Sequence, residues 1–246
     1  MTNEILFYFR SSIYMRLIVI FFFTLLFCFN GSTQHALEID CDTMRYEYAA
    51  YVDSIGYYED LFAGTHEAKV SDNRLRLAYF VALRHYPELK QAKVKLKLKP
   101  ISSTMQAQPR WDFIFQKRSA RSYAVFVNSN ASITGISYQD LSFNSLVGWI
   151  GHEMAHVLDY SKKNNGQLFA FISSYVFDKN ELRRTERKAD KVTIKHGLGM
   201  QLLEGVNFFH RSKKVKKAYR EKKKKYYLTP EEIIADIEDQ CHDKKH

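Results

Sequence analysis

Two histidines and a glutamate stand close together in the segment GHEMAHVLDY, residues 151–160. His152 and His156 are four residues apart, so on an α-helix both imidazoles lie on one face, one turn apart. Neutral imidazole is a good zinc ligand, and two histidines at this spacing can reach one ion. Glu153 is then free to act as general base, because zinc lowers the pKa of a bound water from about 15.7 to roughly 7. The pattern predicts metal-assisted hydrolysis of amide bonds.

A catalytic zinc site also needs a third ligand from the protein. The downstream segment ELRRTERKADKVTIKHG offers Glu181, Glu186 and Asp190. Glu186 and Asp190 are four residues apart and share one helical face. Glu186 would bind the ion, and Asp190, one turn further on, would accept the N–H of a ligating histidine and fix its tautomer.

The motif His152-Glu153-x-x-His156, followed by Glu186-x-x-x-Asp190, resembles the gluzincin metallopeptidases. These include thermolysin-like enzymes, the CAAX prenyl protease family and the compact soluble minigluzincins, which are the closest match. The segment ERKAD is similar to the E-x-E-A-D form of the prenyl protease family, with lysine in place of its second glutamate. The resemblance covers about residues 120–200.

A second class of zinc peptidase, the metzincins, is excluded. Metzincins place a histidine six residues after the second histidine of the motif, and Lys162 occupies that place here. Their glycine position is Asp159. The multi-span membrane core of the prenyl proteases is also absent, so their lipidated substrates are not expected.

The resemblance implies an α+β fold. A small antiparallel sheet with an edge strand would lie over a zincin-like pair of active-site helices, between helical N- and C-terminal parts. It also implies a Zn²⁺ cofactor and an extended peptide or protein substrate, paired with the edge strand through its backbone. The segment SYAVFVN, residues 122–128, is the candidate edge strand. An oxyanion donor is needed as well, and Tyr160, His196 and His210 remain open.

The elements that must position these residues follow from periodicity and capping signals. Helices are predicted over residues 42–62, 72–86 (capped by Ser71), 142–160 (capped by Ser142), 178–197 (with a capping box Asp178-x-x-Glu181), 202–209, and from Thr229 onward. Strands are predicted over residues 92–99, 111–115 and 122–128. In the first strand, AKVKLKLK, lysines alternate with apolar residues, which indicates a half-buried strand with a lysine-lined outer face.

The N-terminal sequence has the features of a targeting segment. Residues 17–29, LIVIFFFTLLFCF, form an apolar run of thirteen after Arg10 and Arg16, which is short for a membrane span. We predict a signal peptide over residues 1–33, with Met15 as an alternative start, and an extracytoplasmic protein, periplasmic or secreted. The alternative is an uncleaved N-terminal membrane anchor. Residues 34–246 are predicted to form one domain.

The charge of the chain raises the question of an anionic partner. The net charge is +10, and residues 211–225 hold ten lysines or arginines. This tract is either a solvated helix face or a contact with an anionic membrane or envelope surface. Nucleic acid is not expected as a partner of an exported chain. Cys41 and Cys241 form a disulfide or remain free thiols.

Together these features predict an exported zinc metalloendopeptidase of the gluzincin type. His152, His156 and Glu186 would hold zinc, Glu153 would be the catalytic base, and Asp190 would orient a ligand. One alternative is a non-catalytic, zinc-site-containing protein that binds peptide or a cell-envelope polymer. A third interpretation is a membrane-tethered structural protein in which the histidines are incidental.

Overall fold

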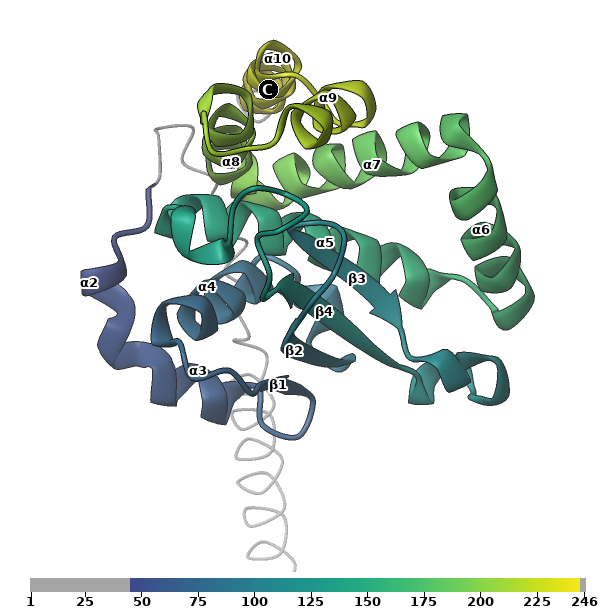
Figure 1. Cartoon of the computed structure of the whole chain (residues 1–246). Helices are drawn as coiled ribbons and strands as arrows, with labels where there is room; N and C mark the ends of the chain where they lie inside the picture. Colours follow the sequence, from purple (N-terminus) through teal and green to yellow (C-terminus); the bar gives the residue numbers. More distant parts are fainter. Residues whose placement is uncertain (1–44, 244–246) are drawn as a thin grey trace, which may run out of the picture. The chain divides into compact units, whose positions relative to one another are not determined.

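The computed structural model describes residues 45–243, in which a four-stranded sheet lies against a larger set of helices (Figure 1). The strands are, in order across the sheet, β1 (His66–Ala68), β2 (Lys93–Lys99), β4 (Ser122–Asn128) and β3 (Met105–Pro109). β1 pairs with β2 and β2 with β4 in parallel, whereas β3 is antiparallel to β4. The fold is therefore α+β, as expected, but the sheet is mixed and the predicted antiparallel sheet is wrong. Parallel neighbours require a crossover, which a helix supplies between β1 and β2.

Two further strand predictions are wrong. Residues 111–115 form a short 3₁₀ helix, η3 (Trp111–Phe115), and expose Trp111 and Phe115 at 78% and 80%. The true third strand is β3, whose sequence MQAQP buries only Met105 and Ala107. β4 was the expected edge strand, but it lies between β2 and β3. The free edge near the helices therefore belongs to β3.

Helices make up most of the rest of the described chain. They are α2 (Tyr48–Tyr51), η1 (Val52–Ser54), α3 (Ile55–Leu61), α4 (Asn73–Arg84), η2 (Pro87–Leu89), η4 (Arg118–Ala120), η5 (Tyr138–Asp140), α5 (Phe143–Lys162), α6 (Asn165–Phe177), α7 (Lys179–Thr193), a π-helical turn η6 (Ile194–Leu198), α8 (Gly199–Arg211), α9 (Lys217–Tyr226) and α10 (Pro230–Asp243). The helix expected over residues 42–62 is thus broken into three short pieces within the part that the structure describes. α6 was not predicted at all.

The capping predictions have mixed outcomes. Ser142 caps α5 by accepting from the Ser145 N–H at 3.0 Å, as predicted. Thr229 and Glu232 exchange bonds at the start of α10, also as predicted. Asp72, not Ser71, caps α4.

At the start of α7, Asp178 accepts from the Asn180 N–H as its cap. Glu181 does not complete the expected capping box, because its carboxylate pairs with Arg184 at 2.7 Å. Gly197, with φ of 80°, lies in the left-handed region and marks the break between α7 and α8.

α5 is the central helix of the molecule and is buried along nearly its whole length. It contacts α4, α7 and α8 as well as the strands β3 and β4 (Figure 1). Its predicted core stripe, which includes Val147, Ile150 and Met154, is fully buried. The polar stripe with His152, Glu153 and His156 is buried too, since the sheet and α7 cover it. The chemistry-bearing residues therefore lie inside the protein.

α5 and α8 approach each other closely at two glycines. A Cβ atom added to Gly148 would lie 2.4 Å from the backbone carbonyl of Gln201, and one added to Gly205 would lie 2.4 Å from Nε1 of Trp149. Contacts this short cannot form without moving backbone or a buried indole. Glycine at these positions lets α8 pack directly on the helix that carries the histidines.

We expect Gly148→Ala to destabilise the protein by about 1–3 kcal/mol, because its methyl group would push α5 away from α8. Urea unfolding followed by circular dichroism measures the loss. Gly166→Ala is the matched control, since its added Cβ would meet only Asn164 Oδ1 at 3.6 Å. It should be neutral or stabilise by up to ~1 kcal/mol through helix propensity. Equal effects of the two substitutions would contradict the packing argument.

The N-terminal predictions concern residues outside the described part. The signal peptide over residues 1–33, the alternative start at Met15 and the cysteine Cys41 all fall there. Residues 45–243 belong to one compact unit, Ile39–His246. Within them, no helix combines the length and apolar character that crossing a bilayer requires. Cys241 is disulfide-bonded, and its pairing with Cys41 stays a prediction.

Candidate metal centre

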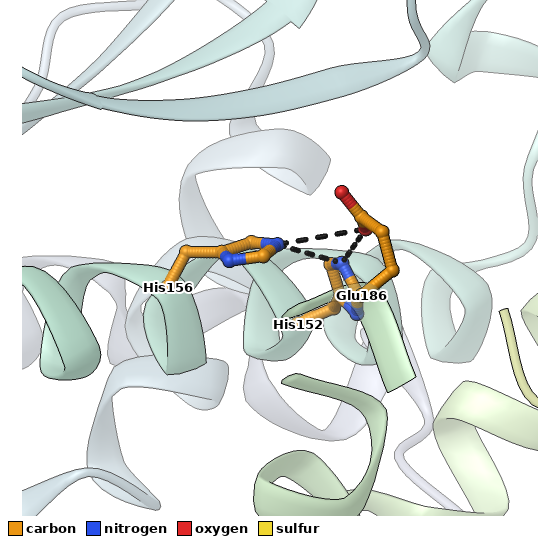
Figure 2. Close-up of side chains that lie close together, drawn as sticks. All are labelled: His152, His156 and Glu186. Carbon is orange, nitrogen blue, oxygen red and sulfur yellow. Dashed lines mark hydrogen bonds and ion pairs between the residues drawn. The ribbon is translucent and has the colours of Figure 1, made fainter. Parts of the chain in front are cut away.

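Three buried side chains converge on one point between α5 and α7 (Figure 2). His152 Nε2 lies 3.1 Å from His156 Nε2 and 3.0 Å from Glu186 Oε2, and the third separation, His156 Nε2 to Glu186 Oε2, is 3.6 Å. Ligand atoms around a tetrahedral zinc ion with bonds of about 2.0–2.2 Å lie roughly 3.3–3.6 Å apart. The spacing and the donor set, two imidazole nitrogens and one carboxylate oxygen, therefore fit a zinc ion.

The two helices place these ligands through their periodicity. α5 supplies both histidines from one face, four residues apart. α7 is strongly amphipathic and buries only one stripe, Thr185, Glu186, Ala189, Asp190 and Thr193, against α5. Glu181 lies outside this stripe and pairs with Arg184. Of the three candidate acids, the structure brings Glu186 and Asp190 to the histidines and leaves Glu181 away.

Asp190 occupies the orienting position predicted for it. The Nδ1–H of His152 donates to Asp190 Oδ1 at 2.8 Å, and the backbone N–H of Leu228 donates to Asp190 Oδ2 at 2.8 Å. The carboxylate is fully buried. Because His152 donates from Nδ1, its Nε2 atom points to Glu186 and His156, which is the orientation a metal ligand needs.

Opposing influences set the charge at the centre. Burial favours neutral His152, but the hydrogen bonds that it donates to Asp190 and Glu186 outweigh burial and raise the pKa of His152 to about 10. Burial likewise disfavours ionised Glu186, yet the hydrogen bonds of His152 and His156 bring its pKa well below the usual range. In the metal-free chain a proton on His152 therefore carries the positive charge among the carboxylates, and a metal ion would displace it.

Glu153 connects the metal centre to the sheet. Its Oε2 atom accepts a hydrogen bond from the backbone N–H of Ala107 at 2.6 Å. The carbonyl of Thr104 and the N–H of Arg110 form hydrogen bonds to β4. Because successive residues of an antiparallel strand face the partner strand alternately, the N–H of Ala107 points away from β4, to the outer side of β3. Burial raises the pKa of Glu153, and the nearby histidines act in the opposite direction. A carboxyl group next to both the ligand atoms and a strand edge is well placed for proton transfer.

A cleft of about 1150 Å³ leads to this centre. The sheet and η3 line one side, and α6 lines the other with Phe171, Ile172 and Val176. Glu153, His156 and Glu186 are among its lining residues. The centre is therefore buried but reachable from one side.

The three candidate oxyanion donors differ in whether they line the cleft. Tyr160 lines the cleft and its ring stacks on His156 with centroids 6.1 Å apart. His196 stacks instead on Tyr86 at 4.3 Å and bonds to the Val192 carbonyl and Glu88. Neither His196 nor His210 lines the cleft. Among the three, only Tyr160 is in reach of the centre.

Two further tyrosines lie at the site and were not predicted from the sequence. Tyr175 of α6 donates its hydroxyl hydrogen bond to Glu186 Oε1, and Tyr227 lies with its ring 5.4 Å from that of His152. Burial raises the pKa of both phenols, so both remain protonated donors. α6 does carry a readable signal, because Asn164 and Gln167 form a capping box at its start.

One lysine of the basic tract is not solvated. Lys223 is only 8% exposed, and its ammonium lies 3.7 Å from the ring centroid of Tyr227 and 4.1 Å from that of Trp149. Phe209 and Tyr219 complete an aromatic cage around it. Cation–π attraction holds the ammonium there. The tract is thus a solvated face for most of its length but anchors α9 beside the metal centre at this residue.

Comparisons of the chain with models of protein families, with curated proteins and with solved structures found no match. The chemistry of the centre must therefore be inferred from the residues themselves.

The ligand assignment predicts different zinc affinities for three single substitutions. Glu186→Ala removes a metal ligand and should leave a two-histidine site that loses zinc readily. Asp190→Ala removes no metal ligand but loses the bonds from His152 Nδ1 and the Leu228 N–H, and it should weaken zinc binding by about 10–100-fold. Glu181→Ala should leave zinc affinity unchanged, because that side chain pairs with Arg184.

Competition with a chromogenic chelator measures all three affinities, starting from a wild-type chain expected to hold about one zinc ion. Circular dichroism of each variant shows whether it remains folded. If Glu181→Ala lost zinc while Glu186→Ala retained it, the assignment of Glu186 as ligand would be wrong.

Proposed function

We propose that this chain is an exported zinc metallopeptidase of the gluzincin type. The observation that carries the proposal is the convergence of three buried ligand atoms from His152, His156 and Glu186, with the carboxylate of Glu153 between them and a strand edge. In finer terms, α5 and α7 are the zincin-like helix pair and β3 is the edge strand. Export rests on the apolar run over residues 17–29.

A zinc ion held by these residues would supply Lewis acidity and a water of lowered pKa. The residues of the chain would supply proton transfer, orientation of the ligands and stabilisation of the oxyanion. Glu153 accepts a proton from the attacking water and delivers it to the leaving amine. Asp190 keeps His152 in the tautomer that presents Nε2, and Tyr175 holds the second oxygen of Glu186. The phenols of Tyr160 and Tyr227 line the cleft and are suited to donate to the developing oxyanion.

The outer edge of β3 is the place for an extended substrate. No other strand within residues 45–243 pairs with that edge. Backbone pairing at β3 would bring a peptide bond past Glu153 with little dependence on its side chains. The N–H of Ala107, now bonded to Glu153, is also the donor that such a substrate would use. Substrate pairing would then release the carboxylate for proton transfer.

Two alternatives from the sequence compare poorly with these features. A structural protein has little use for five buried ionisable groups at one point, since burying charge is costly unless the groups are matched. A non-catalytic binding protein would need the cleft and the metal but not a carboxylate in the position of Glu153. The experiment below therefore distinguishes the peptidase from a non-catalytic binding protein.

Glu153→Gln should retain zinc and lose peptide cleavage by about 10²–10⁴-fold, because it removes the base and leaves the ligands in place. The measurement is digestion of a peptide library by the purified, zinc-loaded chain, with products identified by mass spectrometry. A chelator should abolish wild-type cleavage, and added zinc should restore it.

The zinc content of Glu153→Gln is the control, because an inactive variant without metal would be uninformative about the base. A variant that cleaves at the wild-type rate would place the base elsewhere. A wild-type chain that binds zinc stoichiometrically but cleaves nothing in the library would favour the binding protein over the peptidase.

A further inference from the structure

The lysine row of β2 lies on a central strand. Lys93, Lys95, Lys97 and Lys99 are all exposed, while Val94 and Leu96 on the opposite face are fully buried. Lysines on an outer face commonly protect a sheet edge from pairing with other chains. β4 pairs with the whole length of β2 on one side, whereas β1 pairs only with Val94, Lys95 and Leu96 on the other, so Lys97 and Lys99 lie beyond the end of β1. The row places like charges at every second residue on one face of the strand.

These lysines line the cleft that leads to the metal centre. Lys95, Lys97 and Lys99 are among its lining residues, together with Arg110 and Lys222. Among the described residues that line the cleft, the only carboxylates are those of Glu153 and Glu186, which belong to the centre itself. Away from the centre, the wall of the cleft therefore carries positive charge alone.

Two of the five cations are already paired. Lys95 lies 3.0 Å from Glu67, and Arg110 lies 3.2 Å from Asp112. Lys97, Lys99 and Lys222 form no ion pair with any residue of the described range 45–243. Lys99 only rests over the ring of Phe126, with its ammonium 5.1 Å from the centroid.

The three unpaired cations gather at the end of the cleft where β3 begins. Lys99 pairs in register with Asn128, whose N–H bonds to the carbonyl of Thr104, the residue before β3. Thr104 in turn bonds to the hydroxyl of Tyr219, three residues before Lys222 on α9. The opposite end of the cleft holds Trp111 and Phe113 beside Arg110, whose charge is already paired with Asp112. The two ends thus differ in chemistry.

We propose that Lys97, Lys99 and Lys222 form a subsite for acidic side chains on one flank of a peptide bound in this cleft. The inference deepens the proposed peptidase function by naming its substrate class. A strand added to β3 would lie roughly 14 Å from β2, because neighbouring strands are about 4.8 Å apart. At that distance the lysines do not reach the paired stretch itself, and they would meet only peptide residues that extend past the end of the cleft where β3 begins. A flat lipid surface fits less well, because these lysines line a hollow.

Binding of labelled peptides tests the subsite without requiring cleavage. The protein is the zinc-loaded Glu153→Gln chain. The probes are fluorescein-labelled 12-residue peptides of alanine and serine that carry four glutamates at the N-terminal end, four at the C-terminal end, or glutamines at both. We expect one of the two glutamate peptides to bind about tenfold more tightly than the glutamine peptide in fluorescence anisotropy. This preference should shrink between 50 and 300 mM salt, because the lysines are exposed.

Two charge-reversal variants locate the effect. Lys97→Glu with Lys99→Glu should abolish the preference for glutamate. Lys213→Glu with Lys217→Glu is the matched control, since both lysines are exposed, unpaired in the described chain and outside the cleft. The control should keep the preference. Thermal melting and zinc content should be unchanged in both variants, because all four side chains are on the surface.

Several results would overturn the subsite. Equal binding of all three peptides would do so, as would an equal loss in both charge-reversal variants. Vesicles of phosphatidylcholine with 30% phosphatidylglycerol provide the remaining comparison. If Lys97→Glu with Lys99→Glu lost vesicle binding but kept its peptide preference, the lysines would serve a membrane surface instead. If the glutamate peptide is preferred but the zinc-loaded wild-type chain cleaves no peptide, the peptidase is refuted and the subsite stands. If the wild-type chain cleaves peptides but no glutamate preference is found, the subsite is refuted and the peptidase stands.

Discussion

The hydrogen bond from His152 to Asp190 is the interaction on which the rest of the centre depends. Asp190 is fully buried, and both of its oxygens have partners, His152 Nδ1 on α5 and the Leu228 N–H in the segment before α10. One carboxylate thus fixes α5, α7 and the start of the C-terminal region relative to each other. Removing either partner would leave an uncompensated charge in the interior, which typically costs several kcal/mol. The orientation of His152 and the packing of α7 on α5 are therefore one constraint.

Charge balance explains why the surroundings of the centre are aromatic. Glu153, Glu186 and Asp190 place three carboxylates in a small buried volume. A proton on His152 offsets part of this charge in the metal-free chain, and a divalent ion would offset more. Lys223 brings another positive charge close to these carboxylates, and aromatic rings surround its ammonium. Ring faces attract a cation without adding negative charge, whereas a further carboxylate would increase the excess of negative charge.

The helical part of this arrangement could be predicted from the sequence, and the sheet could not. Ser142 caps a strongly periodic helix, and the spacing of Glu186 and Asp190 correctly places both on the face that meets α5. β3 escaped prediction because the alternation in MQAQP spans only five residues and ends at a proline. η3 was mistaken for a strand because WDFIF is apolar although its largest rings are exposed. Tyr175, Tyr227 and Lys223 reach the centre through tertiary packing, which short-range spacing does not encode.

The identity of the edge strand changes how substrate and base are related. β4 has no free edge for a substrate, because β3 occupies the side of β4 that faces away from β2. With β3 in that place, the N–H of Ala107 serves Glu153 in the free chain and faces the same side that an extended peptide would occupy. The small side chain of Ala107 is buried toward the helices and allows β3 to approach α5 this closely. In the peptidase that we propose, one backbone donor would therefore couple occupancy of the cleft to the freedom of the carboxylate, so that the base would become available where a peptide is present to be cut.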